Sequence, residues 1–227
     1  MFVVIFEVRP KPERFDDYLN LAGQLKPRLE AIDGFIENER YRSQRDAGRL
    51  LSLSTWRDEK ALVRWRTQGA HHAAQMKGRS EIFADYHLRI GEVTFDTQPP
   101  RGLPITQSRF DETEAGDGRA ATITEPTQFS LAGIAPGPDA LATRLGLHES
   151  LPHLAARETF ESITNPGKRV VLASWRSAAA AADWMPIEPP SDSRLRHRQV
   201  RIIRDYGMFD REEAPQYYPP VELKPSS

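Results

Sequence analysis

Two adjacent histidines, His71 and His72, are the residues of this sequence best suited to acid–base chemistry. An imidazole titrates near neutral pH, so it can take a proton from a substrate or donate a hydrogen bond to a substrate oxygen. Successive residues of a helix point about 100° apart, so only one of the two can face a pocket between a helix and a sheet. The alternative is that the pair caps the helix just after Gly69 or lies on its polar face.

Aromatic residues on both sides of the histidines could form the walls of such a pocket. Trp56 and Trp65 offer flat apolar surfaces, which would suit a planar polycyclic molecule. Three further aromatic residues would add to these walls: Phe6, Phe83 and Tyr86. The tryptophans could instead be core residues, because Trp175 and Trp184 repeat their nine-residue spacing in a segment that lacks the histidines.

Several other chemistries have no support in the residue types. The chain has no cysteine, which excludes a disulfide framework, a zinc–thiolate site, an iron–sulfur cluster and a cysteine nucleophile. Adjacent helical histidines cannot both ligate one metal ion, and no acidic residue stands at ligand spacing from them. The sequence also lacks a glycine-rich phosphate loop and a Gly-x-Ser-x-Gly elbow. We therefore expect no metal and no flavin, NAD or ATP.

The charge balance and the N-terminus narrow the classes of partner. Lys and Arg number 31 against 32 Asp and Glu, a net charge of −1, which leaves no basic excess to hold a phosphate backbone. The apolar run at 1–6 is short and has no basic residues before it, so it predicts neither a signal peptide nor a membrane span. We expect a cytoplasmic protein without a nucleic-acid or membrane partner.

The elements that must position the candidate residues follow the order β-α-β-β-α-β of a ferredoxin-like unit. A strand buried on both faces is expected where β-branched and aromatic residues run together, and an amphipathic helix where apolar residues recur every three or four positions. The expected elements are a strand at 2–9, a helix at 13–32 bent or ended by Pro27, a hairpin of strands at 35–45 and 50–56, a helix from Asp58 that resumes at 71–78, and a strand at 86–95.

The pattern returns in a weaker second copy. The segment 50–57 (LLSLSTWR) has a counterpart at 170–176 (VVLASWR), and both tryptophan pairs are nine residues apart. The copy has only short helices, expected at 138–147 and 178–183, and nothing in it matches the histidine segment. We therefore predict a first domain at 1–97 that carries the site, a linker at 98–119, a degenerate second domain at 120–209 and a Pro-rich tail at 210–227.

Three stretches of the first copy carry a resemblance to a known family. They are 56–65 (WRDEKALVRW), 70–79 (AHHAAQMKGR) and 86–93 (YHLRIGEV). In this pattern the chain resembles the antibiotic biosynthesis monooxygenase family, whose members adopt a dimeric α+β barrel. The implied fold is two tandem ferredoxin-like units that pack sheet against sheet within one chain. Each unit would cover the bare apolar sheet face of the other, so a homodimer is possible without being required.

The resemblance also implies an activity, a cofactor-independent oxidation of a small aromatic or quinone-type molecule by dioxygen. In this chemistry the deprotonated substrate supplies the electrons, and the protein supplies a base, a dry pocket and donors for the developing oxyanion. On that basis His71 or His72 is the expected base and Trp65 and Trp56 are the walls. Tyr86 and Arg89 are the expected oxyanion partners.

Two alternatives remain beside this hypothesis. In the haem-degrading relatives a first-strand Asn, a helix Trp and a His about ten residues later form the site. Here Glu7 stands on the first strand and Gln75 lies ten residues after Trp65. Haem degradation is therefore not expected, although haem binding through a histidine stays open. The other alternative is a ligand-binding or structural barrel without catalytic activity.

Overall fold

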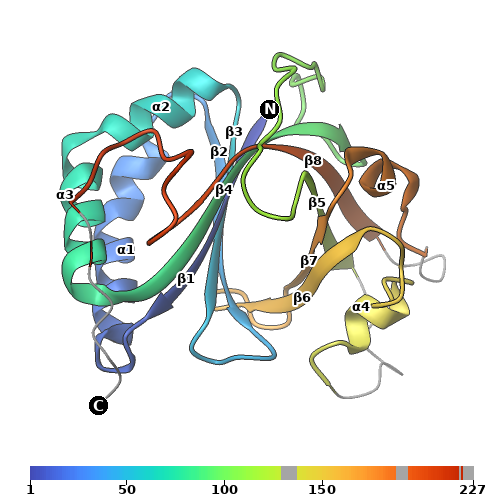
Figure 1. Cartoon of the computed structure of the whole chain (residues 1–227), viewed down its shortest axis with the longest axis horizontal. Helices are drawn as coiled ribbons and strands as arrows, with labels where there is room; N and C mark the ends of the chain where they lie inside the picture. Colours follow the sequence, from blue (N-terminus) through green and yellow to red (C-terminus); the bar gives the residue numbers. More distant parts are fainter. Residues whose placement is uncertain (129–136, 188–193, 220, 222–227) are drawn as a thin grey trace.

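The strands of the protein close into one β-barrel (Figure 1). The structure is a computed structural model that describes residues 1–128, 137–187, 194–219 and 221. The barrel order is β1-β3-β2-β6-β7-β5-β8-β4. The strands are β1 (Phe2–Pro10), β2 (Phe35–Ser43), β3 (Leu50–Trp56), β4 (Phe83–Asp96), β5 (Ala120–Gln128), β6 (Leu154–Ser162), β7 (Arg169–Trp175) and β8 (Arg194–Gly207).

The two halves of the chain join edge to edge to close the barrel. β4 pairs with β8 along the register from His87 to Asp96, and β2 pairs with β6 from Tyr41 to Ser43. Each half contributes a β-α-β-β-α-β unit, and the sheet faces of the two units meet inside the barrel. The predicted tandem α+β barrel is confirmed. The physical reason is that closure removes every open sheet edge while burying the second face of each sheet.

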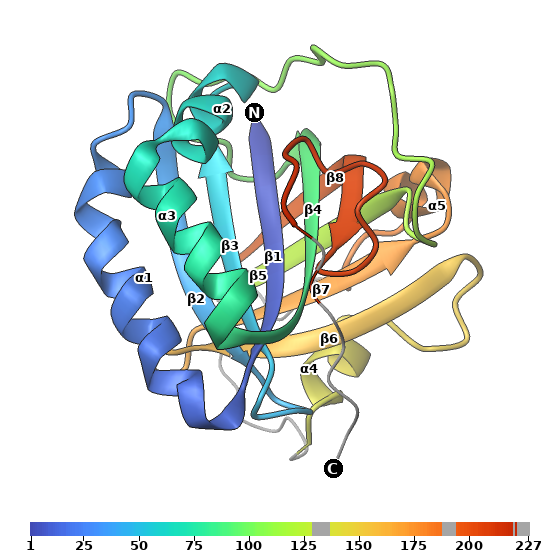
Figure 2. The same ribbon diagram turned by 60° about the vertical axis from the view of Figure 1, so that its left-hand side comes forward.

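Helices cover the outside of the two halves unequally (Figure 1). The first half carries α1 (Phe15–Glu30), α2 (Glu59–Thr67) and α3 (Gly69–Lys77), and Figure 2 shows α1 and α3 in front of β1–β3. The second half carries α4 (Ala140–Arg144) and α5 (Ala178–Asp183). A 3-10 turn, η1 (Pro12–Arg14), precedes α1, and a π-helical turn, η2 (Gly78–Ile82), follows α3.

Several helices and strands begin or end at other residues than the sequence predicts. The expected helix at 13–32 splits at Phe15, and α1 continues past Pro27 to Glu30. The strand expected at 35–45 ends at Ser43, and the helix expected at 138–147 covers only 140–144. The strand expected at 86–95 begins at Phe83, because the π-helical turn ends there. The second helix breaks at Gln68, whose extended backbone ends α2 while its side chain caps α3.

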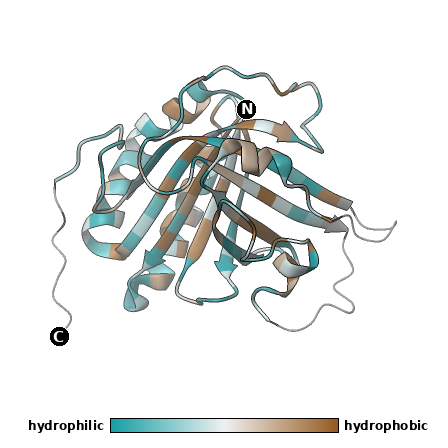
Figure 3. Ribbon diagram, turned by 45° about the vertical axis from the view of Figure 1, so that its right-hand side comes forward, coloured by the Kyte–Doolittle hydropathy of each residue, from teal (hydrophilic) through white to brown (hydrophobic). Residues whose placement is uncertain are grey.

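The first strand is buried on both faces, as its continuous apolar run predicts. Val3 and Ile5 belong to the cluster inside the barrel, whereas Val4 and Phe6 pack toward the helices. Figure 3 shows the resulting alternation of hydrophobic and hydrophilic bands along the strands. Successive side chains of a strand point to opposite faces. The strands β1–β4, called the first sheet below, therefore separate two different environments. One is the barrel interior and the other is the layer under α1–α3.

Gly91 is required by the junction between the two halves. A Cβ atom at this position would lie 2.4 Å from Val200 Cγ1 and 2.6 Å from the Arg201 carbonyl oxygen. We expect Gly91→Ala to lower the free energy of unfolding by about 1–3 kcal/mol, because the contact with the backbone cannot relax. A urea titration measures the loss. Gly23→Ala is the matched control, because nothing lies within 4 Å of its Cβ position and alanine favours the helix. Equal stability of the two variants would contradict the prediction.

Candidate active site between the helices and the first sheet

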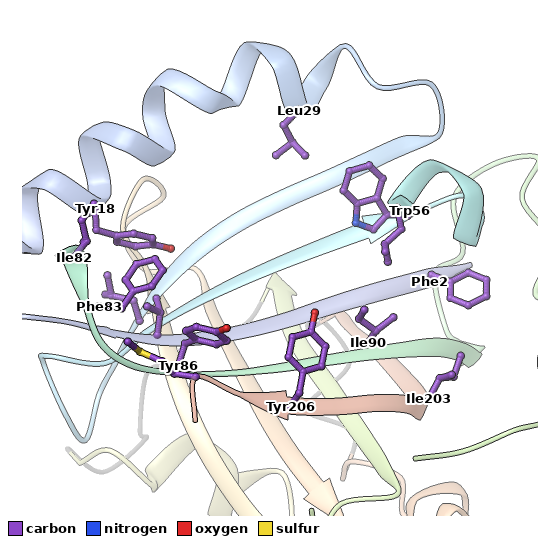
Figure 4. Close-up of a cluster of buried hydrophobic side chains, with 14 of the residues drawn as sticks. Phe2, Tyr18, Leu29, Trp56, Ile82, Phe83, Tyr86, Ile90, Ile203 and Tyr206 are labelled. Atoms are coloured by element: carbon purple, nitrogen blue, oxygen red, sulfur yellow. The ribbon is translucent and has the colours of Figure 1, made fainter. Parts of the chain in front are cut away.

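A cavity of about 180 Å³ lies between α1–α3 and the outer face of the first sheet. Figure 4 shows this layer, with Leu29 of α1 on one side and Ile90 and Tyr206 rising from β4 and β8 on the other. Ala22 and Ala74 line the cavity from the helices, and their small side chains leave the space open. Apart from Tyr206, the cavity is therefore lined by the first half of the chain, in the layer that contains the histidine segment.

The sheet side of the cavity changes from polar to apolar across the strands. One row of register neighbours runs Arg40, Ser52, Phe6, Leu88 and Tyr206, from β2 to β8. The adjacent row runs Asn38, Ser54, Val4 and Ile90. All nine of these residues line the cavity. A bound molecule would thus meet hydrogen-bonding groups over β2 and β3 and apolar groups over β1 and β4.

Two serines on β3 offer hydrogen-bond donors to this space. The Trp56 Nε1–H donates to Ser54 Oγ at 3.0 Å, and the Asn38 amide donates to Ser52 Oγ at 3.0 Å and to the Leu53 carbonyl at 3.1 Å. Both serine oxygens therefore accept within the wall, and each keeps its own hydroxyl proton for another acceptor. A ligand oxygen over β3 would receive those protons.

His71 faces the cavity and stacks on Trp65. The two rings lie 4.1 Å apart between centroids, with 16° between their planes. The Gln68 side chain accepts a hydrogen bond from the His71 backbone N–H at 2.9 Å, which fixes the start of α3. The His71 Nδ1 lies 3.0 Å from the Trp65 carbonyl oxygen, which can only accept, so Nδ1 carries the proton. In the neutral ring, Nε2 is therefore the unprotonated nitrogen.

Burial keeps His71 neutral at physiological pH. The apolar surroundings lower the pKa of His71 from 6.5 to about 4, against a smaller raising effect of the Trp65 carbonyl. Burial likewise lowers the pKa of His197, in the second half, to about 4. A neutral imidazole is the form that can accept a proton.

These two low pKa values predict a loss of stability in mild acid. Between pH 6.5 and 4 an unfolded histidine binds a proton that the folded one refuses, so the free energy of unfolding falls as the pH falls. We expect each histidine to contribute about 1–2 kcal/mol of loss between pH 7 and pH 5. Urea titrations at both pH values measure the difference, which should shrink in His71→Gln and in His197→Gln. A difference unchanged by both substitutions would contradict the assignment.

The second histidine lies outside the cavity. The His72 ring is exposed and stacks on Tyr218 of the C-terminal segment, with 5.7 Å between centroids and 22° between planes. The Tyr218 hydroxyl also donates to the Gln75 side chain at 2.8 Å. The geometry thus separates the two candidates, because it directs His71 to the cavity and His72 to the segment that runs beside α3.

Tyr86 and Arg89 also lie away from the cavity surface. The Tyr86 hydroxyl accepts from Arg79 at 2.6 Å and from Arg211 at 2.7 Å, and its ring packs behind Phe6. Arg89 points to the barrel interior, where it pairs with Glu7 and donates to Ser174 at 2.5 Å. These contacts leave both residues engaged elsewhere, so neither is placed to stabilise an oxyanion in the cavity. Glu7 points away from the cavity as well.

Besides Tyr86, four aromatic residues were predicted as walls of the cavity, and three of them line it. Phe6, Trp65 and Phe83 line the cavity. Trp56 is fully buried, is not part of the cavity lining, and packs edge to face on Phe35, with 5.5 Å between ring centroids. Its counterpart Trp175 is buried in the second half. The first tryptophan of each pair is thus a core residue.

Several residues that line the cavity were not predicted from the sequence, among them Asn38, Arg40, Ser52, Ser54 and Tyr206. The two serines had a detectable signal, since they alternate with leucines in an otherwise apolar strand and therefore share one face. Tyr206 had none, because its contribution depends on the pairing of β8 with β4. Arg66, at the end of α2, also lines the cavity.

Within the described residues, no group of three or more His, Cys, Asp or Glu side chains is arranged to hold a metal ion. Across the same described residues, no helix combines the length and the apolar character needed to cross a membrane.

Comparisons with known proteins bear on the fold and on the class of activity. The family model described as antibiotic biosynthesis monooxygenase matches residues 1–77. A protein of Pyricularia oryzae named jasmonate monooxygenase ABM is 44% identical over 227 residues, covering 97% of this chain and all of that protein. The crystal structure of an aldoxime dehydratase matches with a TM-score of 0.51 at 13% identity, over 88% of this chain and 80% of that one. An anthrone oxidase-like protein matches with a TM-score of 0.38 at 13% identity, over 95% and 96% of the two chains. The family description and the relative's name support a monooxygenase-type function.

Proposed function

Because the chain belongs to the antibiotic biosynthesis monooxygenase family, we propose that it is a cofactor-independent monooxygenase that oxidises a small, largely apolar molecule with dioxygen in this cavity. One observation carries the proposal. A neutral histidine whose Nε2 can accept a proton faces the same small cavity as two serine hydroxyls that can donate to an oxygen. This is the pairing of base and oxyanion donor that removal of a proton next to a carbonyl or phenol requires.

The proposed reaction begins with proton transfer to His71 Nε2. The substrate carbon loses its proton, and the charge moves to the substrate oxygen, where the Ser52 and Ser54 hydroxyls donate to it. The Trp65 carbonyl holds the Nδ1–H and so stabilises the imidazolium that forms. The low pKa of His71 means that its cation persists only beside the anion it created, so the two charges stay paired in the cavity.

The electrons for dioxygen then come from the substrate anion. Its carbon forms a bond to O₂ and, with the proton returned by His71, gives a hydroperoxide. The hydroperoxide loses water to leave a carbonyl. In total a CH₂ group and O₂ become C=O and H₂O, so one oxygen atom enters the product and the other leaves as water. The balance needs no external reductant.

The cavity volume favours a molecule with one ring. An apolar protein cavity of about 150 Å³ accommodates benzene, and the cavity here is about 180 Å³. A monocyclic aromatic or quinone-type compound fits this volume better than a polycyclic one. Jasmonate, named for the Pyricularia relative, is a substituted cyclopentanone and is a second candidate. Its ring carbonyl acidifies the neighbouring C–H groups, as the proposed proton transfer requires.

Incubation with ¹⁸O₂ tests the proposal. Purified protein is supplied with a panel of hydroquinones and with jasmonate, with a chelator present and no reductant, and oxygen uptake and product mass are recorded. We expect one O₂ consumed and one ¹⁸O atom incorporated per product. Binding of panel members without oxygen uptake would instead identify a ligand-binding protein. A Soret shift on haem titration, with oxidation dependent on haem, would also overturn the cofactor-free mechanism.

A further inference from the structure

The charged residues that line the cavity are all positive. Every residue that lines it lies within the described part of the chain, and this lining includes Arg40 and Arg66 but no Asp or Glu. Neither arginine forms an ion pair with a described residue, and the Nε of each is buried without a hydrogen-bond partner there. Both residues are half-buried, and a guanidinium partly removed from water without a counter-ion gains from pairing with an anionic ligand. The cavity is therefore suited to a molecule that is apolar over most of its surface and negatively charged at one point.

The two arginines lie at opposite ends of the cavity. Arg40 and Tyr206 are the first and last members of one row across five strands, so four strand spacings of about 4.8 Å, roughly 19 Å along the curved sheet, separate their backbones. The charge of Arg40 acts on the Tyr18 hydroxyl, and the charge of Arg66 acts on Tyr206. A ligand with one anionic group can place that group at only one of the two ends, so one end must be the anion end.

The polar groups at the Arg40 end include the two serines assigned above to the developing oxyanion, whereas the Tyr206 end pairs a guanidinium with a phenol that the proposed reaction does not use. Burial raises the pKa of Tyr206 to about 12, so its hydroxyl keeps its proton at neutral pH. Figure 4 shows the Tyr206 ring standing on β8 with its hydroxyl toward the helix layer. Arg79 and Arg211 lie behind it and donate to the Tyr86 hydroxyl, which adds positive charge on that side. A carboxylate there would accept from both a guanidinium and a phenol.

We propose that Arg66 and Tyr206 form a carboxylate-binding subsite at the β8 end of the cavity, so that the ligand is a small acid with an apolar ring. The assignment deepens the proposed function, on which it rests, by naming the substrate class of the same cavity. It also gives the second half of the chain a part in the site, because Tyr206 comes from β8. Arg66 lines the same small cavity as Trp65 and His71, so a ligand held at the subsite can reach the Trp65–His71 stack. The carboxylate would hold the ring in place beside His71.

Binding measured without oxygen tests this subsite separately from the chemistry. Cyclohexylacetic acid and its neutral primary amide have the same ring and nearly the same size, and calorimetry under nitrogen gives the dissociation constant of each. We expect the acid to bind about 10- to 100-fold more tightly than the amide at pH 7, the range of one or two charge-assisted hydrogen bonds. Arg66→Gln should abolish this preference, and Tyr206→Phe should reduce it several-fold.

Arg64→Gln is the matched control, because Arg64 lies on the same helix but donates to the Asp33 carbonyl at 2.8 Å on the outer surface. It should keep the full preference for the acid. An acid that binds no better than the amide would overturn the subsite, as would an Arg66→Gln variant that weakens both probes equally. The thermal unfolding midpoint of each variant shows whether it folds. Tight acid binding without any oxidation would leave the subsite standing and refute the monooxygenase, whereas oxidation of neutral substrates alone would do the reverse.

Discussion

His71→Gln is expected to lower the rate of oxygen consumption by about 100- to 10,000-fold, the range for loss of a general base. Glutamine can still donate to the Trp65 carbonyl but cannot take a proton at neutral pH, so the substitution removes the chemistry with little change in shape. Because the pKa of His71 is about 4, the wild-type rate should stay level between pH 6 and 8. An oxygen electrode at saturating substrate measures both effects.

His72→Ala is the control for this experiment. His72 is exposed and stacks on Tyr218 outside the cavity, so its loss should change the rate less than threefold. Ligand affinity measured under nitrogen should be nearly the same in wild type and His71→Gln, which would show that the cavity is intact. A rate that falls with His72 and not with His71 would refute the assigned base.

Trp56→Ala is expected to cost about 3–5 kcal/mol of unfolding free energy, the usual range for truncating a large buried aromatic residue. Trp56 is fully buried, packs on Phe35 and donates to Ser54, so its removal leaves both a void and an unpaired hydroxyl. Guanidinium titration measures the loss.

Trp65→Ala should affect ligand binding more than stability, whereas Trp56→Ala should affect stability most. Trp65 lines the cavity and carries the His71 ring, so its truncation should weaken binding of a ring-containing ligand about tenfold while costing less stability than Trp56→Ala. Calorimetry and guanidinium titration on both variants separate the two roles. If the two substitutions cost the same stability and the same affinity, the division into a core tryptophan and a wall tryptophan is wrong.

The fold was predictable because its signals are local. The continuous apolar run of β1 indicates a strand with two buried faces, and the repeated Trp-Arg segments at 56–57 and 175–176 indicate two copies of one unit. Two such units within one chain leave few ways to cover their bare sheet faces. The helix ends were less predictable. Pro27 did not stop α1, and Gln68 broke the second helix through a capping contact that leaves little trace in the apolar pattern.

The candidate site was only partly predictable, because side-chain direction depends on which face of a sheet a residue occupies. In a closed barrel both faces of β1 and β4 are buried, so burial does not distinguish the cavity side from the interior. Arg89 illustrates this, since it follows Leu88 on the same strand but points to Glu7 inside the barrel while Leu88 lines the cavity.

The amino-acid order established a duplicated α+β unit with a histidine pair and aromatic residues confined to its first copy, because strand and helix periods are written in neighbouring residues. Packing alone decided that His71 turns inward and His72 outward, that Trp65 borders the cavity whereas Trp56 is buried in the core, and that Tyr206 joins a site more than 130 residues away in sequence. Those choices depend on register between distant strands and on where the helices leave space, which are properties of the assembled barrel.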